Sequence, residues 1–476
     1  MQKHQPFFSE NSCLPKSFYS REDNVMGSIL IKNGFVADAK NTVFSKQNVL
    51  VKDGKIEAFL REEPEADTVI DAEGKIVSPG FIDIHMHEDP LSADGNDIDF
   101  CIFDCMLKMG VTTVIAGNCG TNLCDPVRYL DTVDAKGAPV NVAMYAGHSY
   151  LRYEAGTTDR YAAATPSQLD TLERSTARAL DGGCVGVSYG IRYAPGLTQE
   201  ELERTAKLCK KDDKLIAAHL RDDAAGVFAA AEEFISAGLK FGLNTEISHI
   251  GSMAGFGQME EFLQITDRYR ANGLNLHCDC YPYYAYSTQI GSATYDEGFL
   301  DRYHTGYDVV ELCEGKYRGM RCTEELFRKV RAEYPDMITV CHVMKHEDVD
   351  MAMAHTGVIL GSDGLLNNGQ GHPRAAGAFP HFIKEFINTG KVSLADGIAK
   401  MTSAAAEKLS LSGKGGLEKG SDADIVIFDP KTVKDNATFA DPVAEPEGID
   451  YVIIGGKIAV EKGKIINHRL GRAIRK

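Results

Sequence analysis

The chain has 476 residues, of which 43% are hydrophobic and 25% charged, and this composition excludes a disordered or fibrous protein. Its formal net charge of -17 argues against a nucleic acid partner, because binding to phosphate backbones needs clustered lysine and arginine. No apolar stretch reaches the roughly 20 residues that cross a bilayer, and the N-terminus lacks the apolar core of a signal peptide. We therefore expect a cytoplasmic protein with no membrane partner.

The two ends of the chain predict a small β domain. Residues 1–27 are polar and without periodicity, so we expect an irregular extension there. Short alternating segments with Asn-Gly and Asp-Gly turns then fill residues 28–79, and similar hairpin patterns return in residues 413–476. We predict that these two terminal segments form one composite β-sandwich.

Residues 80–412 alternate apolar strand-like runs with amphipathic helical runs, a pattern that is typical of parallel βα units. About eight units can be counted, the number that closes a (β/α)8 TIM barrel. The predicted strands are "GFIDIHMH", "VTTVIAGN", "NVAMYAGH", "CVGVSYG", "KLIAAHL", "LNTEISHI", "LNLHCDCYPY" and "GVILGSDG". Segments such as "TPSQLDTLERSTARALDGG" and "TQEELERTAKLCKKDD" predict helices with threonine N-caps.

The stretch of about residues 291–348 is too long for an ordinary barrel loop and contains helical patterns. It follows the seventh predicted strand on the side where such barrels keep their active sites. We predict that it is an inserted lid.

The first predicted barrel strand carries two histidines at its carboxyl end, in "GFIDIHMHEDP". Side chains alternate along a strand, so His85 and His87 project to the same face, which is the interior of a closed barrel. We expect Glu88 and Asp89, which follow, to belong to a supporting shell or a loop. A histidine pair alone is also compatible with two polar residues at a strand end.

Other strand ends carry the same kinds of side chain: Cys119 after the second strand, His219 after the fifth, His249 after the sixth and Asp363 after the eighth. These residues are scattered along the chain but converge in a barrel. Imidazole, thiolate and carboxylate are ligands that zinc prefers, and an open coordination position activates water. The pattern therefore predicts a metal-dependent hydrolase.

With these residues in place, the chain resembles the amidohydrolase superfamily and, within it, the D-aminoacylase (N-acyl-D-amino-acid deacylase) family, from about residue 28 to the C-terminus. The matching motifs are "PGFIDIHMH", "GNCG", "GHSYLR", "HLRDD", "SHI", "YPY", "GSDG" and "HPR", followed by the terminal "ADIVIFD". Their order is more specific than any one of them.

The resemblance implies zinc-dependent hydrolysis of N-acyl-D-amino acids to a carboxylate and a free D-amino acid, by metal-activated hydroxide. It implies one tightly bound zinc at Cys119, His219 and His249. A second, weaker position would use His85 and His87 and share Cys119, because the fourth strand lacks the lysine that bridges two metals in many relatives. Asp363 resembles the catalytic aspartate, which would take a proton from water and return it to the departing amine.

The resemblance also implies substrate contacts. Arg374 would clamp the α-carboxylate, for which a planar guanidinium is well suited. Tyr281 and Ser287 resemble residues that hold the scissile carbonyl or the carboxylate, and Tyr193 resembles a pocket-lining residue. His148, at the end of the third strand, either touches the site or makes a structural hydrogen bond.

One departure concerns the sixth-strand motif. Family members often carry lysine two positions after the histidine, whereas Gly251 stands there in this chain and Ser252 follows. The substrate's amino acid side chain is therefore left open.

Two alternatives remain. The first is a cyclic amide or imide hydrolase, similar to hydantoinases and dihydropyrimidinases, against which the missing lysine counts. The second is a non-catalytic assembly protein on the same barrel, which would have lost its ligands, although the ligand set here is complete. The expected partner is the small-molecule N-acyl amino acid substrate, and a homo-oligomer is left open.

Overall fold

A computed structural model describes residues 27–476, so the irregular extension expected before Gly27 lies outside the described residues. Its centre is an eight-stranded parallel sheet in the order β18-β14-β13-β12-β11-β10-β9-β8. The strands are β8 (Phe81–Asp83), β9 (Val111–Ala116), β10 (Asn141–Gly147), β11 (Gly186–Gly190), β12 (Leu215–His219), β13 (Asn244–Ile247), β14 (Leu276–Cys280) and β18 (Val358–Leu360). Each lies within one of the eight predicted segments, which confirms the α/β barrel.

The barrel closes between its first and last strands, just past their carboxyl ends. The amide of Asp363 donates to the carbonyl of His85 (2.7 Å), and the amide of His87 donates to the carbonyl of Gly364 (3.0 Å). Closure therefore joins the segment that carries the two histidines directly to the segment that carries Asp363.

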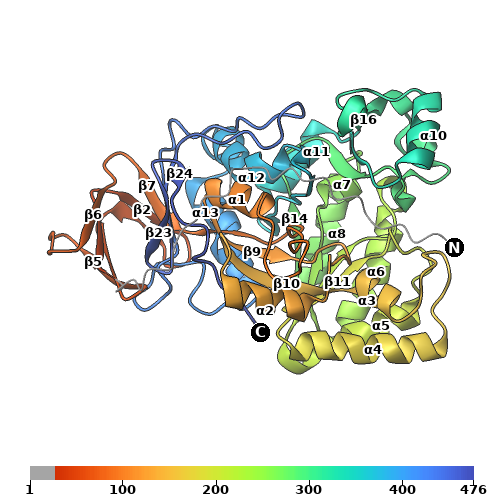
Figure 1. Cartoon of the computed structure of the whole chain (residues 1–476), viewed down its shortest axis with the longest axis horizontal. Helices are drawn as coiled ribbons and strands as arrows, with labels where there is room; N and C mark the ends of the chain where they lie inside the picture. Colours follow the sequence, from red (N-terminus) through yellow and green to blue (C-terminus); the bar gives the residue numbers. More distant parts are fainter. Residues whose placement is uncertain (1–26) are drawn as a thin grey trace.

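Helices follow the strands and cover the barrel, as Figure 1 shows for α2, α4, α5, α6 and α8 around the strands. Their bounds are α1 (Ile102–Lys108), α2 (Pro126–Lys136), α3 (His148–Glu154), α4 (Pro166–Asp181), α5 (Gln199–Ala206), α6 (Val227–Phe241), α7 (Gly251–Ala254), α8 (Met259–Ala271), α11 (His346–Ala354), α12 (Arg374–Phe382), α13 (Leu394–Met401) and α14 (Ser403–Lys408). The predicted threonine caps are confirmed: Thr165 forms a capping box at α4, and Thr198 accepts the amide of Glu201 at α5.

The terminal segments pair with each other at one end of the molecule, on the left of Figure 1. One sheet has the order β5-β4-β1-β6 and the other β24-β23-β22-β21-β7-β2-β3. The strands are β1 (Ile29–Lys32), β2 (Phe35–Asp38), β3 (Val43–Lys46), β4 (Asn48–Lys52), β5 (Lys55–Leu60), β6 (Thr68–Asp71), β7 (Ile76–Pro79), β21 (Ile425–Phe428), β22 (Ile449–Ile454), β23 (Lys457–Glu461) and β24 (Lys464–Ile465). Antiparallel pairing of β21 with β7 joins the two ends of the chain, which confirms the composite β unit. Its exact boundaries stay a prediction.

A separate unit is inserted between β14 and β18 and projects at the upper right of Figure 1. It contains an antiparallel sheet of order β15-β17-β16. Its elements are β15 (Tyr286–Gln289), α9 (Phe299–Tyr303), β16 (Val310–Leu312), α10 (Glu324–Glu333) and β17 (Ile338–Cys341).

The barrel interior is a packed core. Buried residues of β8, β9, β10, β12 and β18, together with residues of α14, form one apolar cluster that includes Ile82, Ile115, Tyr145, Leu215 and Ile359. The site must therefore lie at one end of the barrel. In the described part of the chain, no helix has the length and apolarity that a bilayer crossing requires.

Candidate metal centre

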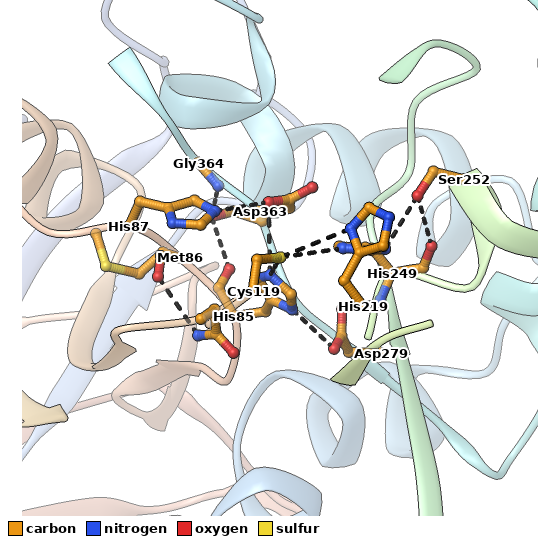
Figure 2. A network of polar contacts seen from close by, with 12 residues as sticks. His85, Met86, His87, Cys119, His219, His249, Ser252, Asp279, Asp363 and Gly364 are labelled. Atoms are coloured by element: carbon orange, nitrogen blue, oxygen red, sulfur yellow. Dashed lines mark hydrogen bonds and ion pairs between the residues drawn. The ribbon is translucent and has the colours of Figure 1, made fainter. Parts of the chain in front are cut away.

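Five predicted metal ligands and Asp363 meet at the carboxyl ends of the barrel strands, with Cys119 at the centre (Figure 2). Two groups of ligand atoms form, each with all members within 4.8 Å of one another. The first consists of His85, His87, Cys119 and Asp363, and the second of Cys119, His219 and His249. Cys119 belongs to both groups, in the position predicted for a residue that bridges two metal positions.

The distances within the cluster fit zinc. Cys119 Sγ lies 3.2 Å from His249 Nε2, 3.5 Å from His85 Nε2 and 4.0 Å from His219 Nδ1. A sulfur and a nitrogen bound to one tetrahedral zinc lie about 3.6 Å apart, given the usual Zn–S and Zn–N bond lengths. The donor set of thiolate and imidazole is also the one zinc favours. The residues present therefore fit a zinc centre.

Three members of the cluster have left-handed backbones, at φ 53° for Cys119, 36° for His249 and 48° for Asp363. Such a conformation costs roughly 1–2 kcal/mol for a residue with a side chain, and it persists where surrounding structure enforces it. In the "GNCG" loop, a Cβ on Gly120 would lie 2.6 Å from the backbone nitrogen of Gly190. The loop that presents Cys119 therefore needs glycine for close packing.

The chain fixes the two histidines nearest Cys119 from behind. Asp279 Oδ2 lies 3.0 Å from His85 Nδ1, and Asp279 Oδ1 accepts the amide of His249 at 2.8 Å. Ser252 Oγ lies 3.0 Å from His249 Nδ1. Such partners orient metal-binding imidazoles. Sequence reasoning missed Asp279, although a carboxylate between Cys278 and Cys280 in a buried strand points to the opposite face from the two thiols and was a readable signal.

Charge is concentrated in the first group. Burial opposes ionisation of Cys119, but His249 and His85 hold its pKa well below the usual 9.0. Burial likewise opposes protonation of His85 and His87, yet Asp279 and Cys119 hold the pKa of His85 well above 6.5, and Asp363 and Cys119 raise the pKa of His87 to about 9. The site thus stabilises a thiolate, the form that binds metal.

His219 has the opposite shift. Burial, followed by the nearby His249 and Arg192, holds its pKa well below 6.5. The imidazole is therefore neutral at pH 7 and has a lone pair for a metal.

Asp363 connects the predicted metal ligands to the predicted carboxylate clamp. Its Oδ1 lies 3.3 Å from His87 Nε2 and 3.5 Å from His85 Nε2, while its Oδ2 lies 2.9 Å from Arg374 Nη2. Burial alone would raise the pKa of Asp363, but Arg374 and His87 hold it well below 3.8. The carboxylate is therefore ionised at pH 7.

Arg374 is buried, at 1% exposure, and its guanidinium stacks 4.4 Å from the ring centroid of Tyr281. Its Nε and Nη1 have no hydrogen-bond partner among the described residues, and neither has Ser287 Oγ. Buried donors without partners are costly, so these groups are available to a ligand. Tyr193 lies with its ring 4.6 Å from that of His219. The structure thus brings Tyr281 and Tyr193 together with the cluster.

His148 is not brought to the cluster. It begins α3 and packs against Tyr189. Its Nε2 lies 3.2 Å from Glu201 Oε1, close enough for an ion pair, but the two atoms are not aligned for a hydrogen bond. Glu201 also accepts from Arg152 Nε at 2.7 Å. These contacts support a structural role for His148, although they do not include the hydrogen bond that the sequence left open.

The acidic pair after His87 organises loops. Glu88 accepts the amides of Gly117 (3.1 Å) and Leu123 (2.9 Å), on either side of Cys119. Asp89 accepts the amides of Cys101, Ile102 and Phe103 at the start of α1. Among the described residues, neither carboxylate bonds to the side chain of a predicted metal ligand. The pair therefore supports the loops around the cluster.

The fourth strand contributes no lysine. The inward-facing Ser188 of β11 instead accepts the amide of Gly120 at 3.1 Å and donates to the carbonyl of Gly117. It thereby holds the loop of Cys119, the residue that takes the central position.

A closed (β/α) barrel with histidine, cysteine and aspartate at its carboxyl end defines the class of metal-dependent barrel hydrolases. The Amidohydrolase family signature matches residues 76–459. The chain belongs to the amidohydrolase family.

More specific similarities extend over most of the chain. An N-acyl-D-glutamate deacylase from Alcaligenes xylosoxydans xylosoxydans is 29% identical, over 94% of this chain and 96% of that protein. The crystal structure of an N-acyl-D-glutamate deacylase from Bordetella bronchiseptica, complexed with zinc and a phosphonate inhibitor that mimics the tetrahedral intermediate, is 28% identical, covers 94% of this chain and 99% of its own, and has a TM-score of 0.84.

A D-aminoacylase structure described with a binuclear metal centre matches with the same TM-score of 0.84 at 27% identity, over 94% of this chain and 99% of its own. An L-hydantoinase from Arthrobacter aurescens is more distant, with a TM-score of 0.64 and 17% identity over 95% of this chain and all of its own. At that identity the likeness concerns the fold alone.

Proposed function

We propose that this protein is a zinc-dependent amidohydrolase that cleaves N-acyl-D-amino acids into a carboxylate and a free D-amino acid. The observation that carries the proposal is the position of Asp363, with one carboxylate oxygen beside two metal ligands and the other bound to the buried Arg374. A substrate whose amide lies next to a carboxylate can place the amide at the metal ligands and the carboxylate at Arg374 at the same time. The deacylases named above support this substrate class.

Arg374 is proposed to bind the substrate carboxylate through guanidinium N–H groups that Asp363 does not use, since its Nε and Nη1 lack a partner among the described residues. Tyr281 holds the guanidinium plane by stacking, and Ser287 offers a further hydroxyl. A fixed planar guanidinium positions the substrate and so lowers the entropic part of the barrier.

Cys119, His219 and His249 would hold one zinc, and His85 and His87 would complete a second position that shares Cys119. Zinc bound there would supply Lewis acidity, which lowers the pKa of water and polarises a carbonyl. Asp363 would accept the proton of the attacking water at Oδ1 and deliver it to the leaving amine nitrogen. Such proton transfer typically contributes about 10²- to 10⁴-fold in rate.

The inserted unit is proposed to act as a lid. Tyr303 of α9 donates its hydroxyl to Asp223 at 2.7 Å, and Arg302 Nε lies 3.3 Å from the same carboxylate. Asp223 follows the ligand His219 by four residues and also pairs with Arg192 at 3.1 Å. The insertion is thus tied to the rim of the site, where a cover would exclude water.

Amine release from a matched library of N-acetyl and N-formyl D- and L-amino acids tests the function, with zinc-loaded wild-type protein and the Asp363→Asn variant. We expect turnover of D substrates that is lost in the variant. Ring opening of hydantoin and dihydrouracil, assayed in parallel, tests the cyclic amide alternative. Silence on every open-chain substrate with activity on a cyclic one would overturn the proposal.

The cytoplasmic location stays a prediction that rests on composition. A homo-oligomer also stays a prediction, which light scattering coupled to size-exclusion chromatography would measure.

A further inference from the structure

We propose that Ser252 is a positioning residue of the metal centre, which holds the His249 imidazole so that its Nε2 lone pair points at the position between Cys119 and His219. This inference rests on the zinc centre of the proposed function. It concerns the residue after Gly251, the position at which the sequence departs from the family's usual lysine-containing motif.

The hydrogen bonds of Ser252 assign the roles of donor and acceptor. Its hydroxyl donates to the carbonyl of His249 at 3.0 Å, so its proton is used there. The contact of 3.0 Å between Ser252 Oγ and His249 Nδ1 must then be a bond in which the ring N–H donates to the hydroxyl oxygen. A neutral imidazole with its proton on Nδ1 has its lone pair on Nε2, the atom 3.2 Å from Cys119 Sγ. Figure 2 shows Ser252 on the side of His249 away from Cys119.

The local fold makes this contact rigid. Ser252 lies in α7 and is 6% exposed, and its amide donates to the carbonyl of His249 at 2.9 Å. The backbone of His249 is itself fixed in the left-handed region and donates its amide to Asp279. The serine and histidine therefore form one short closed turn that holds the hydroxyl beside the ring nitrogen.

The two histidines nearest Cys119 use different supports. His85 Nδ1 lies against a carboxylate, Asp279, whereas His249 Nδ1 lies against a neutral hydroxyl. An apolar or cationic side chain at position 252 could not replace it, because neither offers an acceptor to the ring N–H. The orientation of the His249 ring therefore depends on the hydroxyl as a hydrogen-bond acceptor and not only on the volume of the side chain.

Loss of the hydroxyl would leave a buried ring N–H without a partner and free the imidazole to rotate or change tautomer. Removal of such partners of metal-bound histidine typically costs about 10- to 100-fold in metal affinity. The cost would fall on zinc binding even when no substrate is present, so failure of this inference is separable from failure of the proposed function.

The experiment measures zinc affinity of the full-length apoprotein by competition with a chromophoric chelator, without substrate. We compare wild type with Ser252→Ala and with Ser248→Ala, a matched control one residue from His249 whose buried Oγ has no partner among the described residues. We expect Ser252→Ala to bind its tighter zinc about 10- to 100-fold more weakly, and Ser248→Ala to bind as wild type does. Equal affinity of wild type and Ser252→Ala would overturn the proposal.

An isosteric pair covers the case in which alanine disturbs the turn. Ser252→Thr keeps the hydroxyl and Ser252→Val replaces it with a methyl group, so both place the same bulk in α7. We expect the threonine variant to bind zinc more tightly than the valine variant by a similar factor, with equal thermal midpoints of the two apoproteins. Equal zinc affinities in this pair would show that the hydroxyl orients nothing.

Discussion

The two ends of the barrel use buried charge in opposite ways. At the carboxyl end, histidines, Cys119 and Asp363 converge on one another, some in strained backbone conformations, and two nitrogens of Arg374 have no partner among the described residues. At the amino end, three buried lysines satisfy the carbonyl groups around the strand starts. The carboxyl end thus contains strained residues at the candidate site, whereas the buried groups at the amino end are hydrogen-bonded and stabilise the barrel.

The lysines at the amino end are Lys214, Lys400 and Lys408. Lys400 donates to the carbonyls of His355 and Val358 at the start of β18, and Lys408 donates to the carbonyl of Asn275 before β14 at 2.7 Å. Burial lowers the pKa of Lys400 and of Lys408 to about 8. Buried amines are thus used here as structural donors, and we expect mutations at this end to change stability but not chemistry.

The largest effect should come from Cys119→Ala at the carboxyl end. Cys119 belongs to both ligand groups, so we expect the variant to bind neither zinc and to lose measurable amide hydrolysis. Metal analysis by plasma emission spectrometry after gel filtration gives the stoichiometry. Cys184→Ala, at a buried thiol whose pKa burial raises to about 12, serves as the control. Retention of a full zinc complement in Cys119→Ala would contradict the bridging assignment.

Asp363→Asn should separate chemistry from metal binding. The amide cannot accept the proton, so kcat should fall about 10²- to 10⁴-fold. Zinc at Cys119, His219 and His249 should remain, because these ligands do not include Asp363. Steady-state kinetics and metal content on the same preparation test both halves. A kcat within tenfold of wild type would assign the proton transfer to another group.

Lys400→Met should act at the other end and affect only stability. It leaves the carbonyls of His355 and Val358 without their donor, which we expect to cost about 1–3 kcal/mol of unfolding free energy. The kcat of zinc-loaded enzyme should stay unchanged. Urea denaturation compares the variant with Lys391→Met, a half-exposed lysine paired with Asp350. A fall in kcat without loss of stability would mean that the two ends are not independent.

A further effect at the amino end is a pH dependence of stability. The pKa of Lys400 is about 8 in the folded chain and about 10.4 when unfolded, so between these values the unfolded chain binds more protons at this side chain. This group therefore adds stability as pH rises from about 8 to 10.4. The stability difference between wild type and Lys400→Met should grow when urea unfolding is repeated from pH 7 to pH 10, whereas that for Lys391→Met should stay flat. A constant difference would disprove the depressed pKa.

The cluster of candidate ligands was predictable from the sequence because each of its residues follows a predicted strand, and parallel strands bring their carboxyl ends to one rim. Arg374 and Tyr281 came from resemblance to a family and from no pattern in the chain. Asp279 was missed since thiols on both sides of it drew attention to the other face of β14. Ser252 was given no role because the motif comparison concerned the missing lysine at Gly251, whereas the contact of Ser252 with His249 depends on a turn that no periodicity reports.

The sequence by itself determined the barrel, the composite β unit and the kinds of ligand, because strand alternation, helix caps and strand-end chemistry are local properties of the chain. Only the tertiary structure decided which groups touch. In the structure Asp363 lies between His87 and Arg374. Asp279 contacts His85, Ser252 contacts His249, and His148 lies beside Glu201. The physical reason is that these contacts join residues on different strands and helices, whose meeting depends on barrel closure and on left-handed turns at single residues.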